Sequence, residues 1–258
     1  MNRLLTDFHN HSLRSRCARP EMTVAAIAEQ FDQCGLAMAG ISDHGYADGK
    51  NAERCLSIRR ELAELHPTVD IRVGVELDIC YPGRVLIERE ELELYDYILV
   101  ACTHYQNRQK VALPAAADEW VIMQNMIDMM TYAASLPFAD AIVHPFHVTG
   151  MEDFYPDFDR AKVINRISDE ALRRIARTAR ENEVAIELHA SLLSEPDYAA
   201  AMVRFYRICK QEQVRFSLGS DAHWLAVFGG VRGIFGYLQE VGITEEDIWI
   251  PGKSKNAD

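Results

Sequence analysis

Short apolar runs alternate along this chain with longer segments in which apolar residues recur every three or four positions. An uninterrupted apolar run is typical of a strand that is buried on both faces, whereas the longer period is typical of a helix covering such a sheet. Predicted strands occupy residues 3–12, 37–42, 71–75, 97–102, 139–143, 184–188 and 214–218. Predicted helices occupy residues 22–34, 52–65, 116–135, 169–182, 198–211 and 231–241.

The alternation of strands and helices predicts an α/β fold in which a parallel sheet is covered by helices. Seven strands are about the number that a closed or nearly closed βα barrel needs, so we predict a (β/α)7 barrel. An open doubly wound sheet is the alternative, but such a sheet would gather its ligands at one switch point. The chain also has no GxGxxG or Walker-type loop, so the barrel is the favoured fold.

Each predicted strand ends at, or just before, a His, Asp or Glu residue, and barrels of this kind carry their chemistry at those ends. In the first strand, a spacing of two residues places Asp7, His9 and His11 on one face. A single histidine of this kind could equally be a hydrogen-bonded structural residue. Its recurrence at equivalent positions favours a metal centre, and mixed imidazole and carboxylate ligands suit Zn, Mn or Fe. The candidate ligands are His9, His11, His44, Glu76, His104, His144, Asp221 and His223.

Composition and charge narrow the class of protein. A chain of 258 residues that is 48% hydrophobic fits one domain over 1–258, and we expect residues 252–258 to form a disordered tail. The formal net charge of −12 argues against binding to nucleic-acid phosphates. The six cysteines form no CxxC pair, and we find neither a signal peptide nor a membrane-spanning apolar run. We therefore expect a cytoplasmic enzyme with reduced thiols.

Several short motifs extend over nearly the whole chain: Asp7-Phe-His9-Asn-His11-Ser12, Ser42-Asp43-His44-Gly45, Gly74-Val-Glu76, Thr103-His104, His144-Pro145 and Gly219-Ser-Asp221-Ala-His223. Together they resemble the polymerase and histidinol phosphatase (PHP) family. This resemblance implies a distorted, TIM-like (β/α)7 barrel that holds two or three metal ions and hydrolyses phosphate esters.

The resemblance also implies how the ligands are shared among the metals. The first metal would be held by His9, His11, Glu76 and Asp221. The second would be held by Glu76, as a bridging ligand, with His104 and His144. The third would be held by His44 and His223. By the same resemblance, the residues expected to be catalytic are Glu76, Asp221 and His223.

Cys17 marks a departure from the family pattern. Many relatives supply a further histidine to the third metal six positions after the second histidine of the HxH motif, and this chain has Cys17 there. A thiolate is a good zinc ligand, so we expect Cys17 to take the place of that histidine. The alternative is that Cys17 is a loop thiol and the third site is weak or empty.

The chemistry expected of such a centre is the hydrolysis of a phosphate ester by a metal-bound hydroxide. Two metals about 3.5–4 Å apart, bridged by a carboxylate, can hold a hydroxide at neutral pH and neutralise charge on the phosphoryl oxygens. We expect Asp7 and Asp43 to orient histidines rather than to bind metal. Substrate contacts are predicted for Arg16, Arg19, His147 and His189, with solvated or structural roles as the alternative for each.

The favoured function is a metal-dependent phosphomonoesterase that acts on a small phosphorylated substrate, with histidinol phosphate as one candidate. A nuclease or phosphodiesterase of the same family is an alternative, although the acidic charge disfavours nucleic acid. A non-catalytic metal-binding regulatory module is another alternative. An amidohydrolase-like enzyme would usually need a metal-bridging lysine, which no predicted strand end provides. The sequence does not predict an oligomeric state.

Overall fold

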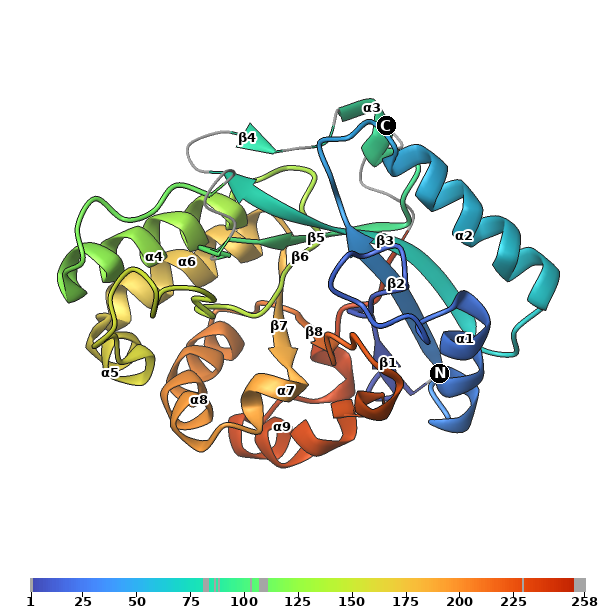
Figure 1. The fold of residues 1–258 in the computed structure, drawn as a ribbon. Coiled ribbons are helices and arrows are strands. Elements are labelled where there is room, and N and C mark those ends of the chain that lie inside the picture. The colour runs from blue at the N-terminus through green and yellow to red at the C-terminus, as the bar shows by residue number, and fades with distance from the viewer. Residues whose placement is uncertain are drawn as a thin grey trace.

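Seven parallel strands follow one another around a nearly closed barrel in the computed structural model of this protein (Figure 1). The structure describes residues 2–80, 84–85, 87, 89–102, 104–106, 111–228 and 230–252. The spatial order of the strands equals their order in the chain, which confirms the predicted (β/α)7 barrel. The strands are β1 (Thr6–Asp7), β2 (Met38–His44), β3 (Asp70–Cys80), β5 (Tyr97–Ala101), β6 (Ala141–Ile142), β7 (Ala185–His189) and β8 (Phe216–Gly219).

Backbone hydrogen bonds bring the last strand back to the first. The Phe8 amide donates to the Leu218 carbonyl at 3.0 Å, and the Asp221 amide donates to the His9 carbonyl at 2.8 Å. The short strand β4 (Arg84–Val85) pairs antiparallel with the far end of β3, off the path of the barrel. The two ends of the sheet therefore meet at the segment that carries the HxH motif.

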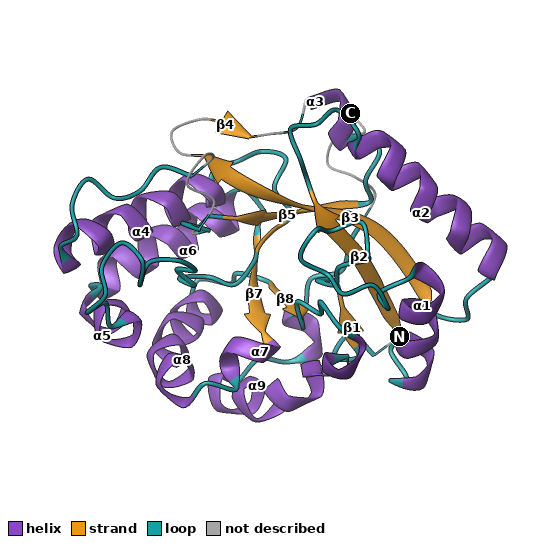
Figure 2. Cartoon of the chain, in the orientation of Figure 1, coloured by secondary structure: helices purple, strands orange, loops and turns teal. Residues whose placement is uncertain are grey.

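Helices lie outside the strands (Figure 2). They are α1 (Val24–Gln33), α2 (Asn51–Leu65), α3 (Arg89–Leu92), α4 (Glu119–Ala134), α5 (Arg160–Arg166), α6 (Asp169–Glu181), α7 (Ala190–Leu193), α8 (Pro196–Gln211) and α9 (Phe235–Val241). Three short 3₁₀ segments, η1 (Leu225–Val227), η2 (Gly230–Ile234) and η3 (Glu245–Asp247), complete the described elements. The predicted helices are all present, whereas α3, α5 and α7 were not predicted because each is too short to show a clear period.

Side-chain caps explain where several of these helices begin. Thr23, Asp118, Asp159 and Ser168 each accept a hydrogen bond from a backbone amide in the first turn of the helix that follows. Each cap satisfies an amide that has no partner within the helix. None of the described helices is both long and apolar enough to cross a membrane.

The interior of the barrel is filled differently at its two ends. At the amino-terminal end, the rings of Phe8, Tyr97 and Trp249 pack edge to face, with centroids 5.5–6.0 Å apart. A Cβ atom at Gly40 or Gly74 would lie 2.0 or 2.3 Å from atoms of the Tyr97 side chain, so both strands need glycine there. The carboxyl-terminal end carries the polar side chains instead. Thr103 and the predicted tail from residue 253 onward lie outside the described residues.

Candidate metal centre

The predicted ligands all lie at the carboxyl-terminal end of the barrel. His9 and His11 follow β1, His44 ends β2, Glu76 lies in β3, His104 follows β5, His144 follows β6, and Asp221 and His223 follow β8. The register of β2 and β3 places His44 directly beside Glu76. Parallel strands thus bring residues that are far apart in the sequence to one rim.

Four buried atoms converge at the centre of this rim. They are Nε2 of His9, Nε2 of His11, Oε2 of Glu76 and Oδ1 of Asp221, and none makes a hydrogen bond of good geometry with the described residues. Nδ1 of His44 lies 2.9 Å from the Glu76 oxygen. The Asp221 oxygen lies 3.3 Å from the His9 nitrogen and 3.0 Å from the His11 nitrogen. The Glu76 oxygen lies 3.6 and 3.4 Å from the same two nitrogens. Because buried polar atoms normally find partners, this converging donor set fits a divalent cation.

The second oxygen of Glu76 faces a different pair of imidazoles. Its Oε1 lies 2.8 Å from Nε2 of His144 and 4.0 Å from Nε2 of His104, and these two rings stack 4.5 Å apart. Burial raises the pKa of Glu76, but the His44 and His9 imidazoles outweigh burial and hold that pKa well below its usual value. Glu76 is therefore an ionised carboxylate that faces two ligand groups at once.

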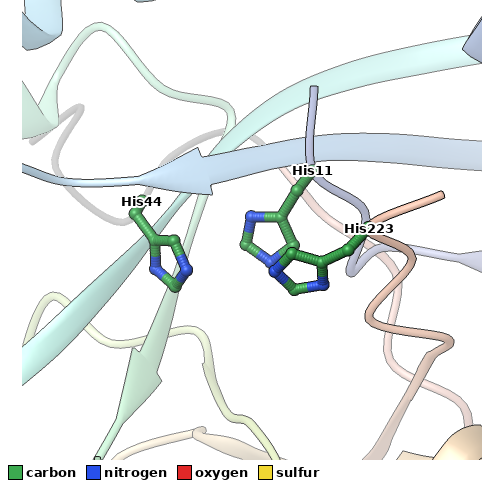
Figure 3. Close-up of side chains that lie close together, drawn as sticks. All are labelled: His11, His44 and His223. Carbon is green, nitrogen blue, oxygen red and sulfur yellow. The ribbon is translucent and has the colours of Figure 1, made fainter. Parts of the chain in front are cut away.

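A third group of imidazoles lies beside the first. The His11 ring stacks against His223 at 4.3 Å and against His44 at 4.6 Å, and the three side chains point toward one another (Figure 3). Sγ of Cys17 lies 3.0 Å from Nε2 of His223. Burial disfavours the thiolate, but hydrogen bonds with His223 and His44 outweigh burial and lower the pKa of Cys17 to about 7. Cys17 thus lies beside His223, and its role as a metal ligand stays a prediction.

Hydrogen bonds behind the rings decide which nitrogen each histidine presents to the centre. Ser15 donates its hydroxyl hydrogen to Asp43 at 2.7 Å, so its oxygen accepts from Nδ1 of His11 at 3.0 Å. Nδ1 of His104 donates to Asp78 at 2.8 Å. In both rings Nε2 is then left with a lone pair toward the centre, as a metal ligand requires.

The two aspartates that we expected to orient histidines act less directly. Asp43 reaches His11 only through Ser15. Asp7 accepts the backbone amides of His9 and Ser220, at 3.3 and 3.0 Å, and so holds the chain around the centre rather than a ring.

Sequence reasoning missed three residues behind the ligands: Ser15, Asp78 and Glu187. Asp78 was missed because we ended the third strand at residue 75, whereas β3 continues to Cys80 and turns Asp78 to the same side as Glu76. Glu187 had a visible signal, since it is the one charged residue in the apolar run 184–188.

A cavity of about 610 Å³ lies over the centre. Arg16 and His147 border it, together with Cys17 and several predicted ligands, whereas Arg19 and His189 do not line it. The neighbouring Arg14 pairs with Glu61. A second hollow of about 710 Å³ lies at the opposite end of the barrel, and the described groups that could hold a metal do not border it.

The positions of Arg16 and His147 suit contact with a bound molecule. The guanidinium of Arg16 lies 4.5 Å over the Tyr46 ring, and its side chain is exposed at the rim. Nδ1 of His147 accepts a hydrogen bond from Arg160 at 2.8 Å, so its hydrogen resides on Nε2. Burial first, then the charges of His144 and Arg160, lower the pKa of His147 to about 2, which keeps this ring neutral.

Comparison with known proteins gives one sequence relative and one structural neighbour of note. No family model matches this chain. A probable phosphatase from Acetivibrio thermocellus is 26% identical over 247 residues, which cover 95% of this chain and 90% of that protein. The crystal structure of histidinol phosphate phosphatase from Lactococcus lactis, complexed with zinc, L-histidinol and phosphate, matches with a TM-score of 0.67. That match covers 93% of this chain and 94% of the other at 15% identity, and it shows the same fold.

Proposed function

We propose that this chain is a metal-dependent phosphomonoesterase of the PHP type that acts on a small phosphorylated molecule. The observation that carries the proposal is the convergence of four buried atoms, in which the carboxylate oxygens of Glu76 and Asp221 lie 3.0–3.6 Å from Nε2 of His9 and His11. The sequence relative is named a probable phosphatase, and the structural neighbour holds zinc with L-histidinol and phosphate. Both agree with the resemblance to the PHP family that the motifs predicted.

The proposed cofactors are two or three divalent ions, namely Zn, Mn or Fe. His9, His11, Glu76 and Asp221 would hold the first ion, Glu76 with His104 and His144 the second, and His44, His223 and Cys17 the third. When bound, such ions lower the pKa of water and neutralise negative charge on phosphoryl oxygens. Glu76 matters most in this scheme, because it is the ligand that two ions would share.

The rim residues would position the substrate. Arg16 presents donors at the mouth of the cavity and is held there by the Tyr46 ring and by Asp48, whose carboxylate lies 3.5 Å away. An arginine can bind two phosphate oxygens at once. His147 would donate from Nε2 as a neutral group, so it would hold an oxygen without acting as an acid. The cavity of about 610 Å³ suits a small molecule such as a histidinol-phosphate-like ester.

The test is metal analysis of the purified protein together with phosphate release from an aryl phosphate monoester. We expect two to three equivalents of Zn, Mn or Fe, and turnover that falls more than about 100-fold in Glu76→Ala, because losing an outer partner of a ligand already costs about 10–100-fold. Arg215→Ala, at the opposite end of the barrel, is the matched control and should retain both metal and turnover.

Other outcomes would point to another function. Less than one metal equivalent, with no turnover after any metal is added, would overturn the proposed function, and bound metal without turnover would favour the non-catalytic metal-binding module. Cleavage of a diester in preference to the monoester would favour the nuclease alternative.

A further inference from the structure

Strand β7 supplies none of the proposed metal ligands, yet two of its side chains face the centre. Glu187 and His189 are two residues apart, so they point to the same side of the strand, and both are buried. Glu187 has no exposed surface at all. A fully buried carboxylate must have partners that compensate for its desolvation, so its contacts indicate its role.

The two oxygens of Glu187 hold two different proposed ligands. Oε1 lies 2.8 Å from Nδ1 of His9, and Oε2 accepts the backbone amide of His144 at 2.6 Å. Gly219 makes room for this carboxylate, because a Cβ atom there would lie 2.0 Å from Oε1. The carboxylate of Glu187 thus explains why the Gly219-Ser-Asp221-Ala-His223 motif begins with glycine, which the sequence alone did not reveal.

The contact with His9 sets the tautomer of that ring. An ionised carboxylate only accepts hydrogen bonds, so Nδ1 of His9 carries a hydrogen, and in the neutral ring that a metal requires the lone pair is on Nε2. That Nε2 is the atom that faces Glu76 and Asp221 at 3.6 and 3.3 Å. Glu187 therefore makes His9 a competent ligand for the first proposed ion.

The contact with His144 fixes its backbone. His144 has a positive φ of 32°, which is unfavourable for a residue with a side chain and needs support from its surroundings. The hydrogen bond from its amide to Glu187 supplies that support, and it leaves Nε2 of His144 2.8 Å from Oε1 of Glu76. The same carboxylate thus also positions a ligand of the second proposed ion.

His189, two residues after Glu187 in β7, also contacts a proposed ligand. Its Nδ1 accepts the Leu192 amide at 3.2 Å, so its Nε2 carries the hydrogen and donates to Oδ2 of Asp221 at 3.3 Å. Neither ring nitrogen of His189 is then left to bind a metal. Its partner Asp221 also has a positive φ, of 53°, and keeps Oδ1 toward His9 and His11.

We propose that Glu187 is a positioning residue that couples the first and second metal sites. This inference rests on the proposed function only in requiring that the centre binds metal. Because one carboxylate orients His9 and the backbone of His144, its loss should weaken both sites together.

Glu187→Gln is the decisive variant because a glutamine side chain has one acceptor and one donor end. If the glutamine amide nitrogen faces His9, Nδ1 of His9 must accept a hydrogen bond and the ring hydrogen moves to Nε2. If the amide nitrogen faces His144 instead, it opposes the backbone N–H of His144. Either orientation breaks one of the two contacts, so we expect the affinity of at least one site for Zn²⁺, titrated into metal-free protein against a chelating dye, to fall about 10–100-fold. Glu187→Ala removes both contacts and should weaken both sites by this measure. We also expect the ¹⁵N signals of the His9 ring in the metal-free variant to lose the Nδ1–H form of the wild type.

Ser217→Ala is the matched control. Ser217 lies beside Glu187 in the register of β7 and β8, is buried, and its hydroxyl has no hydrogen-bond partner among the described residues. We expect this variant to bind Zn²⁺ like the wild type. Should Glu187→Gln not fold, Glu187→Asp keeps the charge but is one methylene too short to reach both partners, and it should weaken the two sites in the same way.

The outcomes separate this inference from the proposed function. A wild-type protein that binds no metal would overturn both. Normal metal binding by the wild type and unchanged affinity in the Glu187 variants would overturn the positioning role alone. Loss at one site only in Glu187→Ala would overturn the coupling, and equal losses in Ser217→Ala would show that packing rather than position is responsible.

Discussion

At the scale of single residues, Glu76 and Cys17 carry the most specific consequences. Glu76 is only 1% exposed, and each of its oxygens faces a different group of imidazoles. Cys17 lies at the edge of the centre, with its Sγ 3.0 Å from Nε2 of His223. The His223 ring presents that nitrogen because its Nδ1 donates to the Asp221 carbonyl at 2.9 Å.

Cys17→Ala should lower the metal content by one equivalent, because the third group would lose one of its proposed ligands. Cys17→His should keep that equivalent, since an imidazole is also a good ligand for these metals. Elemental analysis after gel filtration measures the content, and Cys34→Ala, a partly buried thiol outside the centre, serves as control. An unchanged content in Cys17→Ala would show that Cys17 is a loop thiol.

At the scale of elements, an ion pair joins α8 to η3, and the chain after η3 covers the amino-terminal end of the barrel. Nζ of Lys210 lies 2.6 and 2.5 Å from the two oxygens of Asp247 in η3. Partial burial raises the pKa of Asp247, but Lys210 and hydrogen bonds from Thr244 outweigh burial and lower that pKa. Shortly after η3, Trp249 enters the barrel beside Phe8 and Tyr97.

Asp247→Asn should reduce the free energy of unfolding at pH 7 by up to about 1 kcal/mol, because the pair is partly exposed. A lowered native pKa means that this stabilisation is present above the unfolded pKa of about 3.9 and is lost as the pH falls through the native value. Urea unfolding of metal-free protein between pH 7 and 3 should therefore show the wild type and the variant converging in acid. Glu246→Gln, an exposed neighbour, should match the wild type throughout, and a constant difference between wild type and Asp247→Asn would contradict the assignment.

At the scale of the whole molecule, the side chains that pack the barrel interior and those that form the proposed metal centre lie at opposite ends of the barrel axis. Aromatic rings fill the amino-terminal end, and imidazoles and carboxylates fill the carboxyl-terminal end. The hydroxyl of Tyr97 donates to the Phe8 carbonyl at 2.7 Å, directly before His9. The side chains packed at the amino-terminal end therefore contact the segment that carries the HxH motif.

Gly74→Ala should destabilise the whole barrel by about 1–3 kcal/mol, the usual cost of overpacking. Its new methyl group would lie 2.3 Å from the ring of Tyr97, which is buried and packs against Phe8 and Trp249. Denaturant unfolding measures the change, with Gly236→Ala in α9 as control because open space surrounds that position. Equal stabilities for Gly74→Ala and the wild type would show that the interior is less tightly packed than described.

The apolar runs and the polar residues at their ends were enough to predict the seven strands and the end of the barrel at which the eight candidate ligands lie. This was possible because a buried parallel strand is mostly apolar and carries its polar side chains toward its carboxyl-terminal end. The motifs added the resemblance to the PHP family, which agrees with the matched phosphatases. The expected location in the cytoplasm and the single-domain boundaries stay predictions.

Only the tertiary structure decided which side chains support those ligands. His9 and Glu187 are 178 positions apart, and they meet because β7 and β1 face the same interior. Arg14 and Arg16 are neighbours of the same type, yet one pairs with Glu61 and the other borders the cavity. Local periodicity determines which residues are buried, whereas strand register and closure of the barrel determine which buried residues touch.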